Sequence, residues 1–204
     1  MQATIGWTAY DQASESYFET YESLRFGTTH RAFLKFLPAP GSECLDIGSG
    51  SGRDAAALAK RGYAVTAVEP SAGLRKLASA RHTHPHIDWL DDALPKLDKV
   101  KALEKRYDFI LLSAVWMHIR PGDRLSSLKS IASVVKPGGV ICMSLRIGPA
   151  PANRVMYPID VNELLLQAKA NGLDALYVSR LAPDALKRPG VGWIKVVLRP
   201  VPSG

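Results

Sequence analysis

The stretch that most constrains the fold is residues 44–69, which combine a short buried strand, a glycine-rich turn, a helix and a second strand. Residues 44–47 are apolar except for one aspartate, which is typical of a strand covered on both faces of a parallel sheet. Three glycines at alternate positions then permit positive φ, and an alanine-rich helix and a second β-rich run, 63–68, follow. We therefore predict a right-handed parallel crossover, with a ligand crevice at the carboxyl ends of its strands.

Two acidic residues at those strand ends select the charge of the ligand. Asp46 precedes Gly48 by two positions, and Glu69 ends the second strand. The Gly-x-Gly-x-Gly spacing of Gly48, Gly50 and Gly52 differs from the Gly-x-Gly-x-x-Gly of dinucleotide-binding proteins. A carboxylate beside the turn repels a pyrophosphate and attracts a cationic amino-acid group, directly or through water. Glu69 is placed to accept hydrogen bonds from both hydroxyls of a ribose.

An amino acid joined to a nucleoside describes S-adenosylmethionine (SAM). Over residues 45–145 the chain resembles the class I SAM-dependent methyltransferases, whose first motif is an acid, x, Gly-x-Gly-x-Gly and whose second strand ends in a ribose-binding acid. The alternative is that the glycines only make a tight turn. The resemblance implies SAM as the cofactor and an α/β fold, a three-layer sandwich. Its Rossmann-like, mostly parallel sheet would have seven strands in the order 3-2-1-4-5-7-6, with helices on both faces.

The resemblance also implies which residues bind the cofactor. In the loop after the third strand, the family's acidic residue before a small apolar one binds the adenine amino group. This role fits Asp92 before Ala93, with Asp91 as the second choice and an exposed acidic turn as the alternative. Ser71 is expected to cap the helix that follows Glu69. The predicted cofactor-binding residues are Tyr17, Asp46, Gly48, Ser49, Gly50, Gly52, Arg53, Asp54, Glu69, Pro70, Ser71, Asp91, Asp92, Ala93, Ser113 and Ala114.

The segment after the predicted fourth strand, 107–113, carries the candidate for chemistry. In the family this strand ends beside the transferring methyl group. The Asn/Asp-Pro-Pro-aromatic motif of many amide and nucleic-acid amine methyltransferases does not follow it here, which counts against amino groups of DNA bases. Trp116 is predicted to cover the methionine portion or the acceptor. His118 is predicted to take a proton from a hydroxyl or amine acceptor, the alternative being that it caps the following helix.

Further acceptor-binding residues are expected in two segments outside the motifs. A helix over 7–26 has one aromatic-lined face, and Tyr10 and Tyr17 on it are candidates for a lid, or are packed on the core. Arg146 ends the fifth strand, 140–145, and either binds an acceptor carboxylate or phosphate or pairs with an acidic neighbour. Tyr157 lies in a proline-rich loop, 148–158. The predicted substrate-binding residues are Tyr10, Trp116, Arg146 and Tyr157.

The predicted organisation is one structural domain, with a helical lid segment, 1–40, before the SAM-binding part, 41–204. Further helices are expected over 28–37, 121–135 and 160–170, a tight turn at Lys-Pro-Gly-Gly, 136–139, and two closing strands over 173–181 and 192–198.

Composition limits the partners. The net charge is +7, but the densest basic stretch, 96–106, has Val100 and Leu103 at helical spacing and no aromatic platforms, so nucleic acid is an unlikely partner. Three alternating histidines, 82–86, have the spacing of metal ligands on a strand, but Pro85 breaks the strand, so we expect an exposed connection and no metal. Two cysteines in buried strands, with no apolar run of membrane length and no leader pattern, favour the cytoplasm.

The function predicted from these features is SAM-dependent methyl transfer to a small-molecule O or N acceptor. Two alternatives stay open: a SAM-binding regulatory module without transferase activity, and a methyltransferase acting on nucleic acid or protein. The sequence does not specify the acceptor or the oligomeric state.

Overall fold

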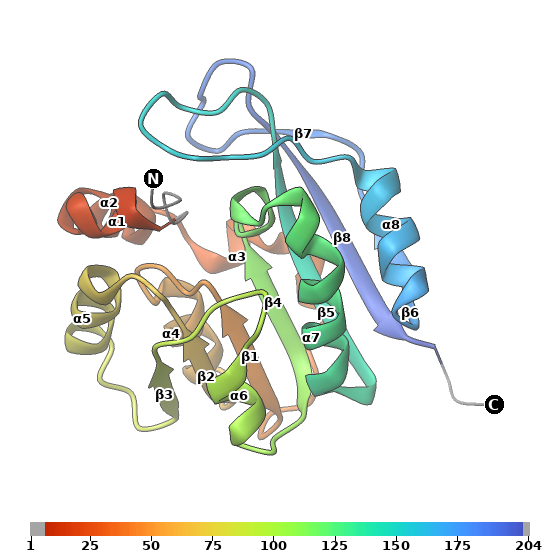
Figure 1. The fold of residues 1–204 in the computed structure, drawn as a ribbon. Coiled ribbons are helices and arrows are strands. Elements are labelled where there is room, and N and C mark those ends of the chain that lie inside the picture. Colours follow the sequence, from red (N-terminus) through yellow and green to blue (C-terminus); the bar gives the residue numbers. More distant parts are fainter. Residues whose placement is uncertain (1–6, 202–204) are drawn as a thin grey trace.

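The computed structural model describes residues 7–201 and consists of a central twisted sheet with helices on both faces (Figure 1). The strands are β1 Glu43–Ile47, β2 Ala64–Val68, β3 Ile87–Leu90, β4 Tyr107–Ser113, β5 Val135–Ile147, β6 Leu173–Val178, β7 Ala182–Pro183 and β8 Gly192–Pro200. The α-helices are α1 Thr8–Gln12, α2 Ser14–Glu22, α3 Phe26–Thr29, α4 Arg53–Ala59, α5 Ala72–Arg81, α6 Asp98–Ala102, α7 Arg124–Val134 and α8 Val161–Ala170. Short 3-10 helices cover Arg31–Phe36, Trp116–His118 and Pro121–Asp123.

The strand order confirms the predicted topology. The sheet runs β3-β2-β1-β4-β5-β8-β6, with β1 to β5 parallel and β8 antiparallel to both β5 and β6. The two-residue β7, which the sequence did not predict, pairs with β8 off this path. The carboxyl ends of the five parallel strands all point upward in Figure 1, toward the side of the sheet where α1 and α2 lie, so the loops that follow these strands gather there.

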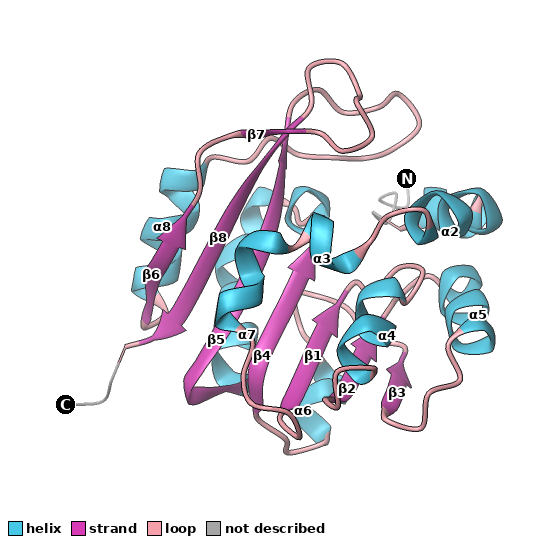
Figure 2. Ribbon diagram, turned by 180° about the vertical axis from the view of Figure 1, so that it is seen from behind, coloured by secondary structure: helices cyan, strands magenta, loops and turns pink. Residues whose placement is uncertain are grey.

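The core is divided by the sheet, because successive residues of a buried strand point to opposite faces. Leu45 and Ile47 of β1 belong to the cluster that packs against α6, α7 and α8, whereas Cys44 belongs to the cluster that packs against α4 and the 3-10 helix Arg31–Phe36. Figure 2 shows the second face, with α3 and α4 in front of the strands. The sheet is therefore the middle layer of the predicted three-layer sandwich.

Local structure departs from the predictions at three places. The helix predicted over 7–26 is interrupted at Ala13, where φ is −134° and ψ is 35°. The helix predicted over 28–37 is a short α3 and a 3-10 helix that meet at His30, whose φ of −114° is not helical. The tight turn predicted at 136–139 is instead part of β5; Gly139 is needed there because a Cβ would lie 2.8 Å from the Tyr107 carbonyl oxygen.

Neither a helix that could span a membrane nor a cluster of metal-binding side chains occurs in residues 7–201. None of their helices combines the length and the apolar character needed to cross a bilayer. The same residues contain no group of three or more His, Cys, Asp or Glu arranged to hold a metal ion. Within the predicted histidine connection, His82 is only partly exposed, and its Nε2 lies 3.2 Å from Oε1 of Glu22 on α2.

Candidate active site

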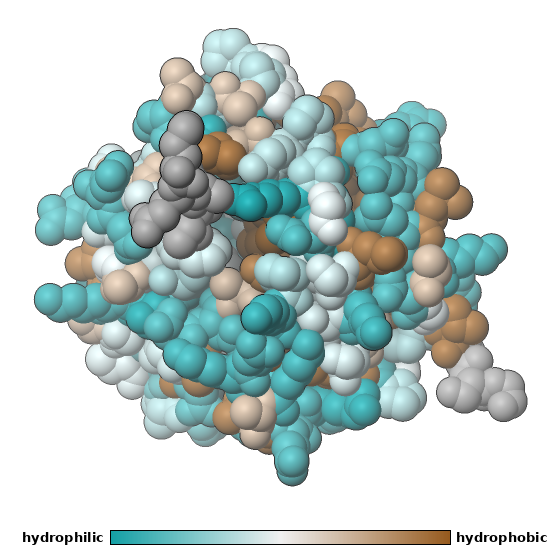
Figure 3. Space-filling view, viewed as in Figure 1, coloured by the Kyte–Doolittle hydropathy of each residue, from teal (hydrophilic) through white to brown (hydrophobic). Residues whose placement is uncertain are grey.

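A cavity of about 660 Å³ opens where the parallel strands end, between the N-terminal helices and the segment 179–193. Figure 3 shows a hollow on this side of the molecule, with hydrophobic residues inside it and hydrophilic residues around it. Of the predicted site residues, the cavity is lined by Tyr10, Gly48, Ser49, Gly50, Arg53, Asp54, Glu69, Pro70, Asp92, Ala93, Ser113, Ala114, His118 and Arg146. The structure does not bring Tyr17, Asp46, Gly52, Ser71, Asp91, Trp116 or Tyr157 to the lining.

The glycine-rich turn forms one wall because its backbone bends sharply after β1. The amides of Gly48 and Ser49 both donate to the Val68 carbonyl oxygen, at 2.8 and 2.9 Å. Gly48 has a φ of +70°, and a Cβ there would lie 2.6 Å from Val115 Cγ2. Gly52 is needed for packing behind the cavity, since a Cβ would collide with the Trp89 ring. The turn therefore presents bare backbone to the cavity.

Glu69 is fixed at the mouth of the turn by two backbone amides. Its Oε2 accepts from Gly50 N at 2.7 Å, and its Oε1 accepts from Ser71 N at 2.8 Å. The side chain is only 5% exposed, yet it lines the cavity, and burial raises its pKa to about 7. Each carboxylate oxygen has a second lone pair, so both can still accept from a ligand hydroxyl.

Asp46 lies behind the turn. It is 1% exposed, and neither carboxylate oxygen has a hydrogen-bond partner among the described residues. Burial and the neighbouring carboxylates of Asp54 and Glu69 raise its pKa well above the usual range. Asp46 is not among the residues that line the cavity, so the structure indicates no direct contact with a ligand. The predicted contact through water stays a prediction.

Ser71 and Asp91 have other partners. Ser71 is the N-cap of α5, as predicted, with Oγ accepting from Leu74 N at 3.2 Å. Asp91 is exposed and forms ion pairs with Arg75 and Lys99, at 3.2 and 3.6 Å. Asp92, the first choice for the adenine contact, does line the cavity. Its oxygens accept from the amides of Ala93 at 2.8 Å and Val100 at 3.0 Å, which orient the carboxylate.

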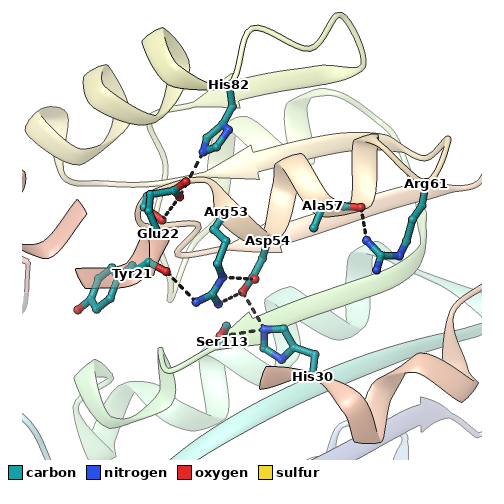
Figure 4. Close-up of polar contacts among 10 residues, drawn as sticks. Tyr21, Glu22, His30, Arg53, Asp54, Ala57, Arg61, His82 and Ser113 are labelled. Atoms are coloured by element: carbon teal, nitrogen blue, oxygen red, sulfur yellow. Dashed lines mark hydrogen bonds and ion pairs between the residues drawn. The ribbon is translucent and has the colours of Figure 1, made fainter. Parts of the chain in front are cut away.

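An ionic network joins Arg53 and Asp54, the first residues of α4, to His30 (Figure 4). Arg53 donates to both oxygens of Asp54 at 2.7 and 2.8 Å, and His30 Nε2 lies 2.8 Å from Asp54 Oδ2. Although burial alone favours the neutral acid, His30 and Arg53 hold the pKa of Asp54 far below its usual range. Ser113 Oγ lies 3.5 Å from the same His30 nitrogen. Sequence reasoning missed His30, because its partner lies on a different element and no motif spacing relates the two.

Tyr10, His118 and Arg154 form a hydrogen-bonded chain in the opposite wall. His118 Nδ1 lies 3.0 Å from the Val155 carbonyl oxygen, which can only accept, so we assign the ring proton to Nδ1. His118 Nε2 is then the acceptor for Tyr10 Oη, 3.0 Å away, and Tyr10 Oη in turn accepts from Arg154 Nη1 at 3.2 Å. Burial lowers the pKa of His118 to about 4. The imidazole is therefore neutral at neutral pH, with its lone pair directed at a phenol.

Three predicted aromatic contacts are not in the lining. Trp116 is 1% exposed in the core, because the 3-10 helix Trp116–His118 turns its indole inward, and Val115 and Met117 line the cavity instead. Tyr17 packs between the rings of Tyr10 and Tyr21, with centroids 4.8 and 6.0 Å away. Tyr21 takes its place in the lining.

Tyr157 is half-buried beside this segment. Its backbone amide donates to the Met117 carbonyl oxygen at 2.7 Å, which ties the proline-rich loop to the 3-10 helix. The loop instead contributes Arg154 to the cavity.

The antiparallel pair β5–β8 forms a basic wall. Arg146 is 5% exposed and donates to the carbonyl oxygens of Gly148 and Pro149, at 3.3 and 2.9 Å. Of the two roles predicted for it, pairing with an acidic neighbour does not occur among residues 7–201. Lys195 on β8 donates to Ser144 Oγ at 2.6 Å, and burial lowers its pKa to about 8. Sequence reasoning missed Lys195, because the strand β8 that carries it has no motif.

Comparisons with known proteins agree with this architecture. A family model described as a methyltransferase domain matches residues 18–177. An uncharacterized methyltransferase of Mycobacterium tuberculosis is 30% identical over 123 residues, which are 60% of each chain. The ubiquinone/menaquinone biosynthesis C-methyltransferase of Rubrivivax gelatinosus is 31% identical over 111 residues, which are 53% of this chain and 41% of that one. The chain thus aligns with about 60% or less of the length of these curated relatives.

Among solved structures, a Burkholderia thailandensis 1,6-didemethyltoxoflavin-N1-methyltransferase with bound 1,6-didemethyltoxoflavin and S-adenosylhomocysteine is similar with a TM-score of 0.71. It is 20% identical, and the match covers 99% of this chain and 92% of the other. This likeness concerns the fold.

Proposed function

The chain belongs to the methyltransferase domain family, and we propose that it transfers a methyl group from SAM to a small-molecule O or N acceptor. One observation carries the proposal: the glycine turn presents bare backbone to the cavity while its amide, with that of Ser71, holds Glu69 at the cavity wall. A cavity of about 660 Å³ enclosed by side chains from several elements supports a small acceptor.

The residues of this site fit the donor. Glu69 would accept from the ribose hydroxyls with its free lone pairs, and Asp92 would accept from the adenine amine beside Ala93. Gly48 and Gly50 would leave room for the amino-acid portion against the backbone. Above its pKa of about 7, the carboxylate of Glu69 disfavours a pyrophosphate at the same place, which supports a cationic donor over a dinucleotide.

The chain's own contribution is alignment and proton removal. When bound, SAM supplies a methyl group already activated by a sulfonium. The protein therefore has to hold the acceptor in line and accept its proton where the acceptor has one to lose. His118 is proposed as that base, because its Nε2 is unprotonated at neutral pH and carries a lone pair. Tyr10 lies between His118 and Arg154, so it would either pass the proton or move aside for the acceptor.

We also propose the segment 1–40 as a lid over this site. The support is that Tyr10 and Tyr21 of α1 and α2 line the cavity; its first six residues lie outside the described part of the chain. We place the protein in the cytoplasm, because Cys44 and Cys142 are buried free thiols, as is usual in a reducing compartment.

Titration calorimetry with SAM tests the donor site. We expect micromolar binding to the unaltered protein and at least about a tenfold loss in Glu69→Ala, because the ribose hydroxyls lose their acceptor. Asp88→Ala is the matched control, since it removes a carboxylate from the neighbouring strand β3 at a residue outside the cavity lining.

Two results would contradict the proposal. Equal affinity of Glu69→Ala and the unaltered protein would remove the ribose contact. Intact SAM binding without S-adenosylhomocysteine release across a screen of small hydroxyl and amine acceptors would favour the regulatory module over the enzyme.

A further inference from the structure

We propose that the methyl acceptor carries an anionic oxygen group, a carboxylate or a phosphate, and that Arg146 and Arg154 bind it. This inference rests on the proposed function, because it concerns the acceptor of that reaction. The wall of the cavity that contains Arg146 and Arg154 has a surplus of positive charge.

The two guanidinium groups lack ionic partners within residues 7–201. Arg146 donates only to backbone carbonyl oxygens, and Arg154 donates to the phenol of Tyr10. The Nε of each arginine is buried and has no hydrogen-bond partner in the described part of the chain. A buried charge without a counter-ion is costly, so an arrangement of this kind favours an anion from outside.

The nearest carboxylate does not neutralise this wall. Asp184 accepts from Arg188 Nε and Nη2, both at 2.8 Å, and from Trp193 Nε1 at 2.7 Å, so its oxygens are already engaged. After burial, repulsion from Arg188 and Arg154 lowers the pKa of Arg146 further. Asp184 therefore forms its ion pair with Arg188 and leaves Arg146 and Arg154 without a paired carboxylate among the described residues.

The strand register directs the basic groups to the same side. Arg146 is paired with Trp193 and Ser144 with Lys195 across β5 and β8, and residues two apart on a strand share a face. Lys195, which bonds Ser144, therefore extends the positive wall deeper into the cavity. A planar guanidinium fork suits the two oxygens of a carboxylate or phosphate.

The position of the arginines points to the acceptor and not to the donor. Arg154 contacts Tyr10, and Tyr10 contacts His118, so the anion site adjoins the proposed base. Glu69 and the glycine turn, the proposed donor site, follow β1 and β2, whereas Arg146 ends β5. An acceptor anchored by its anionic group would present its hydroxyl or amine toward His118.

Calorimetry with three matched probes tests the inference: benzoate, phenyl phosphate and neutral benzamide, each titrated with and without S-adenosylhomocysteine. We expect at least one anion to bind about tenfold or more tightly than benzamide, the preferred one identifying carboxylate or phosphate. Arg146→Gln and Arg154→Gln should each weaken that anion by about tenfold or more and leave benzamide and S-adenosylhomocysteine affinity unchanged. Arg199→Gln, an exposed arginine at the far end of β8, is the control and should change nothing.

Three results would overturn the inference. The first is that benzamide binds as tightly as both anions, and the second is that both arginine variants keep full anion affinity. The third is that the arginine variants lose affinity for S-adenosylhomocysteine, which would assign the arginines to the donor's carboxylate. If Arg146→Gln unfolds, the half-buried Arg154 carries the test alone. Failure of the unaltered protein to bind S-adenosylhomocysteine would contradict the proposed function instead, and the titrations without it would still measure anion preference.

Discussion

His118 is the residue whose surroundings most constrain the proposed chemistry. Its Nδ1–H is held by the Val155 carbonyl and its Nε2 faces the Tyr10 phenol, so a single tautomer is favoured. Burial lowers its pKa to about 4, below the ordinary value. The imidazole is therefore already deprotonated at neutral pH and can accept a proton. Its low basicity suits an acceptor whose proton becomes more acidic as the methyl group is transferred.

We expect the His118 imidazole to stay neutral down to about pH 5.5. The folded protein then binds fewer protons at this site than the unfolded chain between the lowered pKa and the ordinary one. The free energy of unfolding should therefore decrease as pH falls through that interval. Imidazole signals followed by NMR from about pH 8 to about pH 5.5 provide the measurement, with His118→Gln identifying the signal. A midpoint between pH 6 and pH 7 for that signal would contradict the proposed environment.

Single residues also show where sequence reasoning stops. The acids and glycines of the turn could be placed because their chemistry and spacing are local to one crossover. Trp116 and Met117 are adjacent, and only the 3-10 geometry decides that the methionine faces the cavity and the indole faces the core. Tyr21 lies on the predicted aromatic face of 7–26, but the break at Ala13 decides that it lines the cavity in place of Tyr17. His30 and Lys195 reach the site through contacts between distant elements, which no local pattern encodes.

At the scale of elements, α1 is tied to the body of the fold through the N-terminus of α5. Asp11 Oδ1 accepts from Ser71 Oγ at 2.7 Å and from Gly73 N at 3.2 Å. Ser14 packs so closely on Gly73 that a Cβ there would lie 2.8 Å from its Oγ. The proposed lid therefore rests on a helix that also contributes Leu74 to the cavity lining.

Asp11→Ala should loosen α1 and α2 without unfolding the sheet. The substitution removes the two hydrogen bonds, each worth about 1 kcal/mol, that join α1 to the N-terminus of α5. Hydrogen exchange read by mass spectrometry should become faster in α1 and α2 and stay unchanged in β1 and β4. Glu15→Ala, which alters an exposed residue of α2, is the control. Equal exchange in the two variants would show that Asp11 does not hold the segment.

The elements themselves were predictable to different degrees. The central strands and α4, α5, α7 and α8 follow apolar periodicity and capping signals, which act within a few residues. The N-terminal helices and β5 departed from prediction because tertiary contacts decide them: His30 reaches Asp54 at the junction of two short helices, and Gly139 fits against the Tyr107 carbonyl.

For the whole molecule, ligand binding should appear as added stability. A ligand present at about a hundredfold excess over its dissociation constant contributes about 2.7 kcal/mol, which for a chain of this size raises Tm by about 5 to 10 °C. S-adenosylhomocysteine should produce this shift in a thermal melt, and NAD at the same concentration should not, because the first crossover lacks the Gly-x-Gly-x-x-Gly spacing of dinucleotide-binding proteins. A larger shift with NAD would contradict the assigned donor class.

The overall topology was predictable because the first crossover identifies the family, and the family fixes the strand order. The acceptor could not be predicted, because the family's motifs do not extend to the part of the cavity that would bind it. Its wall is built from β8 and the segments around Gly148 and Arg188, whose residues follow no shared motif. The tight approach of Gly148 to the Gly190 carbonyl oxygen shows how closely these two segments are fitted together.

The position of β8 between β5 and β6 has a consequence for the order in which the protein folds. The proposed donor site is made by β1, β2 and the crossover that joins them, so its contacts are local in sequence. The basic wall forms only when β8 pairs with β5. This pairing joins residues that are far apart in the sequence, and such non-local pairing is intrinsically slow. We therefore expect the contacts of the proposed donor site to form earlier during folding than those of the basic wall.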